Sequence, residues 1–296
     1  MKAGKICLLA VLLGLLSAVR AEIVVRDDAG NEVRLKEPAR RIVTLAPHSA
    51  ESLYAAGAGA TLVGTVDYSD YPPAAKKVPR VGGYSRLDLE AIVALKPDLV
   101  IAWQSGNAAV QVDKLRALGL TVFMTQPNLM ADVARQLEQL GKLAGTEPAA
   151  NAAATAFRQR LEGLRKANAG KPAVRVFYQI WKNPLTTVGG QQIITDAMHL
   201  CGGENPFGHF SRMAPTVSLE AVLEADPEAI VATGMGDGRP DWLGDWDKWP
   251  RMTAVKRGNL FHINPDIMQR HTPRILDGAE KLCAHLDVAR SRRPPK

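Results

Sequence analysis

Short apolar runs, separated by stretches with helical spacing, recur along most of the chain. Runs of mainly apolar, partly β-branched residues are typical of strands in a parallel sheet that is buried on both faces. We expect such strands at Arg41–Leu45, Leu62–Val66, Leu99–Trp103, Thr121–Met124, Val174–Ile180, Ala229–Thr233 and Leu260–Ile263. The segments between them predict helices at Ser49–Ala56, Val110–Leu118, Ile193–Leu200 and Pro273–Leu286. Alternating strands and helices indicate an α/β protein with parallel sheets.

Local signals refine the ends of several elements. Glu22–Leu35 contains two short strand-like runs around a DAGN turn and predicts a hairpin. In the first helix, we expect Ser49 to be the N-cap and Glu51 to lie in the first turn, where the helix dipole favours a carboxylate. After the last helix, the tail Arg290–Lys296 is expected to be frayed.

Two segments of the chain repeat one another without a gap. Leu87–Trp103 reads LDLEAIVALKPDLVIAW, and Val217–Thr233 reads VSLEAVLEADPEAIVAT. Each copy predicts a short helix, a proline that ends it because the preceding residue is driven out of the α region, and a buried strand. Two copies in one chain predict two similar α/β lobes with a cleft between them. The repeat also places one glutamate, Glu90 or Glu220, at the same position of each lobe.

Between the two predicted lobes, from about residue 129 to residue 168, the chain is rich in Ala, Gln, Leu and Arg. After a break near Gly145–Pro148, the segment Pro148–Asn168 predicts one helix of about 30 Å at 1.5 Å per residue, the width of a small domain. Because a stiff helix permits less closure than flexible strand crossovers, we expect a binding protein of this kind to move little when its ligand binds. The predicted division is 22–128 for the N-terminal lobe, 129–168 for the connecting helices and 169–296 for the C-terminal lobe.

Residues 1–21 have the three parts of a secretory signal peptide. Lys2 and Lys5 form a basic start, Ile6–Leu16 is apolar, and Val19-Arg20-Ala21 fits a cleavage site. The apolar run is too short to span a bilayer comfortably, so we expect cleavage after Ala21 and export. The formal net charge of +7 then falls by three to +4, because three basic residues and no acidic ones are lost. This mild charge gives no reason to expect a nucleic-acid partner.

Two cysteines, Cys201 and Cys283, remain in the mature chain. In an oxidising compartment an even pair is a candidate disulfide, which would stabilise the fold by about 4 kcal/mol in the entropic model. Two buried thiols are the alternative, and the predicted export favours the bridge.

The common sequence motifs of enzymes do not occur: HExxH, GxSxG and GxxxxGK[ST] are absent. The six histidines are scattered without the spacing of metal ligands. We therefore expect no metal site and no resident cofactor. An exported enzyme that uses Asp266 and His271 as acid and base groups is an alternative, but no nucleophile or metal set accompanies these two residues.

Aromatic and polar residues follow several of the predicted strands. In open α/β sheets, ligands bind at the carboxyl ends of the strands. The residues that meet this criterion, together with Tyr84 in a neighbouring loop, are His48, Tyr68, Tyr71, Trp103, Trp181, Asp266 and Arg270. Flat aromatic faces with few polar groups suit a large conjugated ligand better than a sugar or an amino acid. Packing against loops is the alternative role for each ring, and His48 is either a metal-directed ligand or, as we favour, a solvated loop residue.

Glu90 and Glu220 lie early in the repeated helices, where a carboxylate gains from the helix dipole. That explanation suffices for one glutamate. Because the position is duplicated, we favour a paired role, in which each lobe offers one acidic side chain to an arginine of a two-fold symmetric partner.

The segment from Tyr68 to Ala108, YSDYPPAAKKVPRVGGYSRLDLEAIVALKPDLVIAWQSGNA, resembles the periplasmic vitamin B12-binding proteins of ABC importers. The resemblance continues through KNPLTT, CGGENPF, the second repeat and RHTPRILDGAEKLC, and covers almost the whole mature chain. It implies two Rossmann-like α/β lobes joined by a long rigid α-helix, with cobalamin bound in the cleft between them. It also implies that one glutamate per lobe contacts arginines of the membrane permease dimer, and that the two cysteines are bridged.

The cleft residues of this family carry over one by one. The positions that keep the family's residue are Tyr68, Trp103, Asp266 and Arg270. Four positions depart from it: Tyr84 and Ala214 stand where the family has tryptophans, Thr186 replaces a phenylalanine, and His48 replaces a small residue. Haem-binding relatives place a tyrosine near the position of Tyr84, so that His48 and Tyr84 would also suit an axial pair for haem iron.

The sequence therefore predicts a monomeric periplasmic solute-binding protein that captures cobalamin or a related corrinoid and delivers it to the permease of an ABC importer in the inner membrane. We expect no enzymatic activity. The candidate ligand-binding set includes Trp181 and Thr186 beside the residues named above. The alternative is a haem or iron-siderophore carrier of the same fold, which His48 and Tyr84 favour and which the YSDYPP motif opposes, as do the retained cleft residues.

Overall fold

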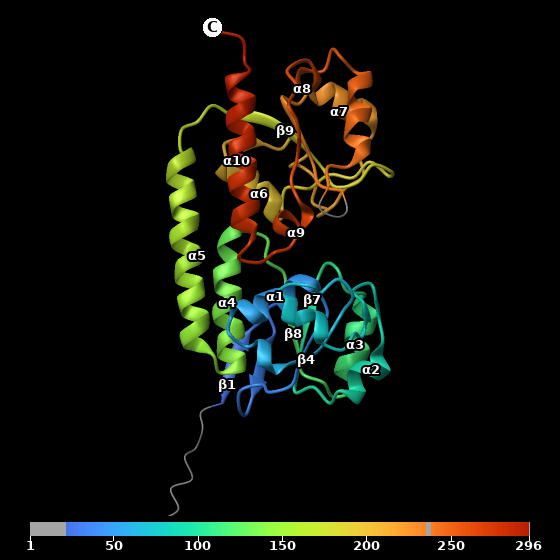
Figure 1. Cartoon of the computed structure of the whole chain (residues 1–296). Helices are drawn as coiled ribbons and strands as arrows, with labels where there is room; N and C mark the ends of the chain where they lie inside the picture. The colour runs from blue at the N-terminus through green and yellow to red at the C-terminus, as the bar shows by residue number, and fades with distance from the viewer. Residues whose placement is uncertain (1–21, 235–237, 296) are drawn as a thin grey trace, which may run out of the picture.

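Two α/β lobes lie one above the other in the computed structural model, which describes residues 22–234 and 238–295 (Figure 1). The predicted signal peptide, residues 1–21, and its cleavage site lie outside the described residues. The chain begins the lower lobe with an antiparallel pair, β1 (Ile23–Arg26) and β2 (Glu32–Leu35). This pair confirms the predicted hairpin.

The N-terminal lobe is built on a parallel sheet with strand order β4-β3-β7-β8. Its strands are β3 (Ile42–Thr44), β4 (Leu62–Thr65), β7 (Leu99–Trp103) and β8 (Val122–Thr125). Most of their side chains are buried, which explains why the strands read as continuous apolar runs. The remaining elements are α1 (Pro47–Ala55), η1 (Gly59–Thr61), η2 (Pro73–Lys77), β5 (Gly82–Gly83), β6 (Arg86–Leu87), α2 (Leu89–Ala94) and α3 (Ala109–Ala117).

The C-terminal lobe repeats this plan with strand order β10-β9-β11-β12, again all parallel. Its strands are β9 (Val174–Gln179), β10 (Gly203–Glu204), β11 (Ala229–Ala232) and β12 (Leu260–His262). The other elements are α6 (Ile193–Leu200), α7 (Leu219–Ala225), η3 (Asp241–Lys248), α8 (Thr253–Lys256), α9 (Pro265–Met268) and α10 (Ile275–Ser291). Two parallel sheets with helices around them confirm the predicted fold class.

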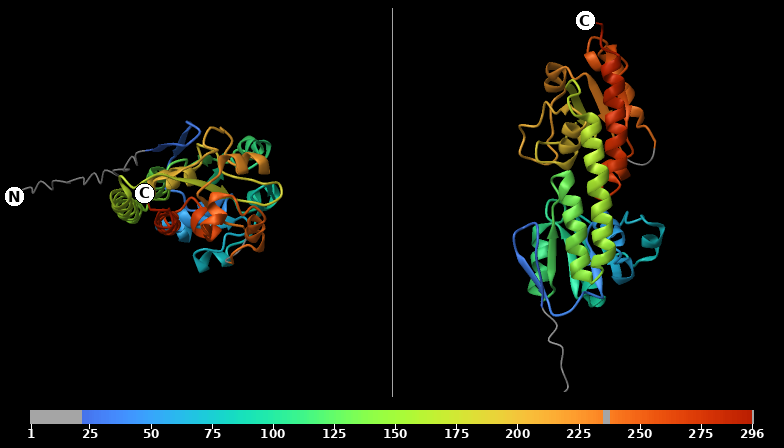
Figure 2. Two further views of the ribbon diagram at one scale, coloured as in Figure 1. Left: turned by 90° about the horizontal axis from the view of Figure 1, so that it is seen from above. Right: turned by 90° about the vertical axis from the view of Figure 1, so that its left-hand side faces the viewer.

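Two long helices, α4 (Met130–Ala144) and α5 (Glu147–Asn168), connect the lobes. α5 runs past both lobes and lies beside α4 and α10 (Figure 2). It contains the segment Pro148–Asn168, for which the sequence predicts one long helix. The two connecting helices approach closely at Gly141, where a Cβ atom would lie 2.3 Å from the Cβ of Ala150. α4 ends at Gly145, whose φ of 70° is in the left-handed region that favours glycine.

One hydrophobic core extends from the N-terminal lobe along α4 and α5 into the C-terminal lobe. It includes Ile42 and Phe123 of the lower sheet, Phe157 of α5 and Val176 of the upper sheet. Because close-packed interiors resist deformation, a shared core of this kind favours a fixed arrangement of the lobes. On this arrangement we propose the lobe boundaries 22–128, 129–168 and 169–296.

The predicted start of the first helix is wrong. α1 begins at Pro47 rather than at Ser49, because the fixed φ of proline suits the first helical position. Ala46 occupies the N-cap position without a side-chain hydrogen bond, so Ser49 is not the cap. Glu51 lies beyond the first turn, and its partners are in the other lobe, as described below.

The predicted fraying of the C-terminal tail is also wrong for its first residues. α10 continues past Leu286 to Ser291. Arg290 donates hydrogen bonds to the carbonyl oxygens of Pro172 and Cys201, and Arg293 forms a 2.8 Å ion pair with Glu228. These contacts attach the end of α10 to the C-terminal sheet.

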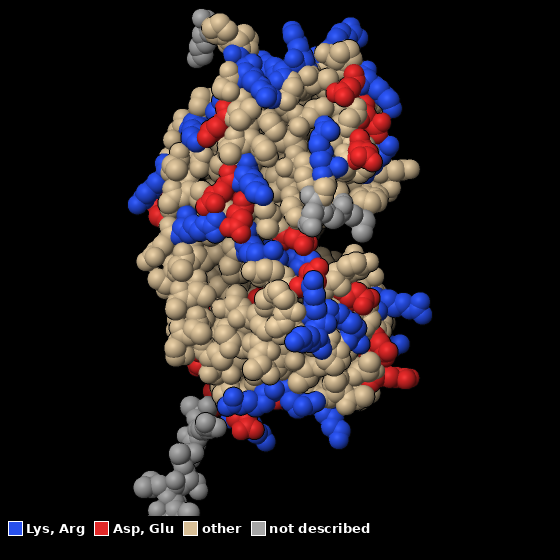
Figure 3. Space-filling view, viewed as in Figure 1, with Lys and Arg blue, Asp and Glu red and all other residues tan. Residues whose placement is uncertain are grey.

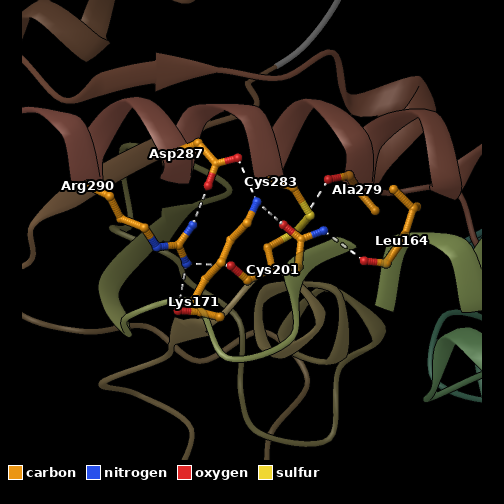
Figure 4. Close-up of a disulfide and its surroundings, with 9 residues drawn as sticks. Leu164, Lys171, Cys201, Ala279, Cys283, Asp287 and Arg290 are labelled. Atoms are coloured by element: carbon orange, nitrogen blue, oxygen red, sulfur yellow. Dashed lines mark hydrogen bonds and ion pairs between the residues drawn. A yellow bond between two sulfur atoms is a disulfide. The ribbon is translucent and has the colours of Figure 1, made fainter. Parts of the chain in front are cut away.

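The predicted disulfide is present between Cys201, at the end of α6, and Cys283 on α10 (Figure 4). Beside it, Lys171 and Arg290 both bind Asp287, at 2.8 and 2.7 Å. The bridge joins residues 82 positions apart in the sequence and lies within the C-terminal lobe. Closing so long a loop restricts the unfolded chain and stabilises this lobe by about 4 kcal/mol.

Candidate functional site

The strand ends of the two lobes meet, as the positions of ligand sites in open α/β sheets predict. The segment from Arg270 to Arg274, which follows α9 in the C-terminal lobe, contacts α1 and the loop after β4 in the N-terminal lobe. Figure 3 shows the outline of the molecule notched between the lobes, on the side away from α5 in Figure 1. Residues from both lobes therefore border one cleft.

Arg270 is the centre of a charged network at this junction. Its guanidinium lies 2.9 Å from the Asp266 carboxylate and 2.7 Å from that of Asp70, and it donates at 3.3 Å to the Tyr68 carbonyl oxygen. Partial burial acts to raise the pKa of Asp70, but the hydrogen bond and the charge of Arg270 outweigh it and lower that pKa. The structure thus brings Tyr68, Asp266 and Arg270 together, as predicted from their positions after strands.

Asp70 is a member of this network that the sequence reasoning did not single out. Its only signal is its place within the YSDYPP motif, between Tyr68 and Tyr71.

Four predicted aromatic residues leave ring surface open to solvent. Their exposed fractions are 69% for Tyr68, 42% for Tyr71, 43% for Tyr84 and 39% for Trp181. Trp103 is less exposed and lies behind Tyr84, with their ring centroids 6.0 Å apart. Exposed rings of this kind give a ligand flat apolar contact area.

A short motif after β7 positions Trp103 and Tyr84. Asn107 accepts a hydrogen bond from the Trp103 backbone N–H at 2.6 Å, and its amide donates at 2.8 Å to the carbonyl oxygens of Leu45 and Tyr84. The Trp103 ring lies against Gly106, where a Cβ atom would be 1.8 Å from a ring carbon. The sequence reasoning used this GNA segment as a family signal and missed its positioning role.

Trp181 and Thr186 lie together on the loop after β9. They form an isolated antiparallel bridge, and Thr186 forms a second one with Thr216. Thr186 is partly exposed. In the segment that runs towards Thr216, Met213 is partly exposed and Ala214 is exposed. The structure places Trp181 and Thr186 side by side. In the described part of the chain, neither forms a hydrogen bond or ion pair with the Arg270 network.

The interpretation of His48 as a solvated loop residue is wrong. His48 belongs to α1 and is 4% exposed. Its ring lies edge-on to Trp103 with centroids 5.0 Å apart, and 5.2 Å from the ring of His271, which is 2% exposed. Burial is the main cause that lowers both pKa values, that of His48 well below its usual range and that of His271 to about 4. Both imidazoles are therefore neutral at pH 7.

Glu51 joins the two lobes, which sequence reasoning did not predict. This carboxylate is 3% exposed and accepts hydrogen bonds from Arg274 at 2.6 and 2.7 Å and from the Thr272 hydroxyl at 2.6 Å. Hydrogen bonding to Glu51 raises the pKa of Arg274, whose guanidinium also lies 3.7 Å from the centre of the Tyr71 ring. The one signal for Glu51 in the sequence is that it is an acidic residue within an otherwise uncharged helix.

Glu90 and Glu220 occupy equivalent, exposed places on the two lobes. Each lies in the first turn of its helix, after an N-cap whose side chain accepts from the residue three positions on: Asp88 in α2 and Ser218 in α7. Figure 1 shows α2 and α7 on the same side of the molecule, opposite α5. Across residues 22–234 and 238–295, neither glutamate takes part in an ion pair.

Within residues 22–234 and 238–295, no cluster of three or more His, Cys, Asp or Glu side chains could hold a metal ion. No helix in the same residues is both long and apolar enough to cross a bilayer.

Comparison with known proteins places the chain in a family. The periplasmic binding protein family matches residues 42–267. The vitamin B12-binding protein of Vibrio cholerae is 37% identical over 255 residues, which are 85% of this chain and 91% of that protein. The vitamin B12-binding protein of Vibrio parahaemolyticus is 34% identical over 260 residues, 87% of this chain and 93% of that protein.

Solved structures give the same result. The crystal structure of the periplasmic vitamin B12-binding protein of Vibrio cholerae aligns with a TM-score of 0.79 at 36% identity, over 86% of this chain and 98% of that one. A periplasmic haem-binding protein from Pseudomonas aeruginosa aligns with a TM-score of 0.73 at 24% identity, over 87% and 95%, a likeness in fold alone. The chain therefore belongs to the periplasmic binding protein family.

Proposed function

We propose that this protein captures cobalamin, or a related corrinoid, in the cleft between its lobes and delivers it to an ABC importer. The proposal is supported by the position of four residues that the resemblance assigns to the ligand cleft: Tyr68, Trp103, Asp266 and Arg270 all lie at the junction of the lobes. Arg270 binds Asp266 and the Tyr68 backbone, and the adjacent His271 lies against Trp103 at 6.2 Å between ring centroids. The exposed rings around this network suit a large ligand with flat conjugated surfaces.

Binding without chemistry is the role we propose, with cobalamin as the transported ligand rather than a resident cofactor. The two groups considered for acid–base catalysis are engaged elsewhere: Asp266 is paired with Arg270, and His271 packs against His48.

Delivery would use the duplicated glutamates. We propose that Glu90 and Glu220 each meet an arginine of the permease, one per half of a two-fold symmetric dimer, with the binding protein itself monomeric. Their equivalent places on α2 and α7 and their exposure support this role. The family supports a periplasmic location, and we propose export through the signal peptide with cleavage after Ala21.

Haem or an iron-siderophore is the alternative ligand, because His48 and Tyr84 would suit axial ligation of haem iron. The arrangement of the rings weighs against this pair. Trp103 contacts both His48 and Tyr84, at 5.0 and 6.0 Å between ring centroids. A porphyrin between the two would have to displace Trp103 from its place against Gly106.

The test compares the two ligands on the purified mature protein. Titration with cyanocobalamin and with haemin, followed by calorimetry and by absorbance, is expected to give saturable binding of cyanocobalamin to one site. Tight binding of haemin without any response to cyanocobalamin would refute the proposal in favour of the alternative.

A further inference from the structure

Three buried polar atoms without a hydrogen-bond partner meet where the lobes join. They are the Nε2 atom of His48, the Nε1 atom of Trp103 and the Nδ1 atom of His271. Their rings form one cluster, with centroids 5.0 Å apart for His48 and Trp103, 5.2 Å for the two histidines and 6.2 Å for Trp103 and His271. They come from three separate segments: α1, the end of β7 and the loop after α9.

Such a cluster is costly in a folded protein. Each buried polar atom that lacks a partner destabilises the fold by about 1–3 kcal/mol, and most native proteins contain only a few. Three in mutual contact at the junction of two lobes point to a ligand that supplies the missing partners. The chemistry of that ligand follows from what the three groups offer.

The cluster is uncharged and has both hydrogen-bond donors and acceptors. Burial keeps both imidazoles neutral at pH 7, so each has one N–H donor and one nitrogen acceptor, while the indole of Trp103 can only donate. A carboxamide has a carbonyl that accepts and an NH₂ that donates, and so matches this set. A carboxylate only accepts, and would bring an uncompensated charge next to neutral rings.

The charged groups around the cluster are already paired with one another. Arg270 binds Asp70 and Asp266, and Glu51 is bound by Arg274 and Thr272. Arg270 also lies 3.9 Å from Glu51. A ligand carboxylate at the cluster would have to compete with these carboxylates for a cation.

We propose that His48, Trp103 and His271 form a carboxamide subsite, which binds an uncharged amide on the edge of the ligand and disfavours a carboxylate at the same place. The inference rests on the proposed function and sharpens it, because corrinoids carry peripheral carboxamides whereas haem carries two carboxylates. His48 is at the same time a departure from the family's small residue, so the subsite belongs to this chain. The three atoms are covered in the ligand-free structure, and the contact requires the side-chain rearrangement that commonly accompanies binding with little backbone motion.

The test uses a set of corrinoid monocarboxylic acids, each made by hydrolysing one peripheral carboxamide of cyanocobalamin. Calorimetry on the wild-type protein at pH 7.5 is expected to show at least one acid that binds about tenfold or more weakly than cyanocobalamin. In the variant His48→Ala/His271→Ala, that difference is expected to shrink to about threefold or less. The preference should persist to pH 5.5 in the wild type, because burial lowers the pKa of His271 to about 4 and that ring is still neutral there.

Three further variants separate recognition from folding. His48→Gln keeps a hydrogen-bonding side chain and is expected to retain much of the preference. Trp103→Phe removes the N–H donor together with part of the aromatic surface, and is expected to reduce the preference as well as the affinity. His285→Ala is the matched control, because His285 stacks on Phe261 away from the cluster and should leave the preference unchanged. Wild-type protein that binds cyanocobalamin and all of its acids equally, or a preference that survives in both His48→Ala/His271→Ala and Trp103→Phe, would overturn the subsite alone. Failure to bind any corrinoid would overturn the proposed function with it.

Discussion

The two copies of the repeat, Leu87–Trp103 and Val217–Thr233, have the same order of elements, a capped short helix followed by a buried strand. Asp88 and Ser218 cap the two helices through the same hydrogen bond, to the third residue on. At the residue before each proline, Lys96 and Asp226 adopt a positive φ, of 48° and 38°. Each copy then enters a buried parallel strand, β7 or β11.

The copies differ where they reach the cleft. Trp103 ends the first strand in contact with Tyr84, whereas the equivalent Thr233 accepts a hydrogen bond from Gln269 at 2.6 Å and is fully buried. The outer ends of the copies, with Glu90 and Glu220, have remained alike. This difference agrees with the proposed function, in which a symmetric partner would contact the outer surface and an asymmetric ligand would bind at the inner one.

The largest effect is expected at the outer surface. Reversing both charges with Glu90→Arg and Glu220→Arg should abolish uptake in cells, because each arginine of the permease would meet a like charge, while ligand affinity of the purified protein is unchanged. Each single reversal should impair uptake to a similar extent. The matched control is Glu162→Arg on α5, the opposite side of the molecule, which should leave uptake intact. Unimpaired uptake in the double variant would remove the docking role.

At the inner surface, exchanging the differing residue should affect one copy only. Trp103→Thr gives the first copy the residue of the second. It is expected to weaken cyanocobalamin binding by about 30-fold or more, because an aromatic side chain that anchors the ligand is lost. This factor corresponds to a loss of at least about 2 kcal/mol of binding free energy. Thr233→Val in the second copy should change the affinity by less than about threefold. Calorimetric titration of both variants measures this, and equal losses would contradict the asymmetry.

The contact between the lobes is expected to affect stability rather than uptake or ligand affinity. Glu51→Gln leaves Arg274 without its buried partner and is expected to lower the free energy of unfolding by about 3–5 kcal/mol. Glu138→Gln breaks an ion pair of similar geometry with Arg158. In that pair the Arg158 side chain is about half exposed and the Glu138 side chain about one-third exposed, so the free energy of unfolding should fall by about 1 kcal/mol or less. Urea unfolding of the two variants provides the comparison. Equal midpoints would mean that Glu51 does not fasten the lobes.

The smallest expected effect is the pH dependence of stability that the buried ring of His271 causes at the junction of the lobes. Because burial depresses the pKa of His271 to about 4, protons bind the unfolded chain more strongly, and the stability due to the neutral ring is lost as the pH falls from 6.5 towards 4. Between pH 6.5 and 5 the loss from this residue amounts to about 2 kcal/mol. His271→Asn should flatten the pH dependence of the urea midpoint in that range. A wild-type midpoint that does not change between pH 6.5 and 5 would show that the ring is not buried in its neutral form.

Local patterns were sufficient to predict most of the fold. The strands, the repeat and the long helix α5 depend on residues that are near in sequence, and the strand-end rule placed Tyr68, Trp103, Asp266 and Arg270 at one junction. The start of α1 was a local error, because the effect of Pro47 was overlooked. The other errors concern residues whose neighbours are distant in the chain. Thr272 and Glu51 are 221 positions apart, so no local signal could show that Glu51 is an ion-pair partner rather than a residue favoured by the helix dipole.

The same reason explains the other two errors. His48 follows a strand and has no apolar periodicity of its own, yet it is buried because His271 covers it from the other lobe. The tail beyond Leu286 is polar and predicts fraying, but Arg290 and Arg293 bind Pro172 and Glu228, which precede β9 and β11 of the C-terminal sheet. Polar residues that become buried through tertiary contacts are therefore the part of the site that the sequence could not predict.

A structure of the mature protein with cyanocobalamin bound tests the central claim most directly. The account predicts that the ligand lies between the lobes, that it contacts Trp103 of the first copy and Arg270, and that it leaves Thr233 of the second copy and both Glu90 and Glu220 untouched. A ligand outside this cleft, or one that contacts the two copies alike, would contradict it.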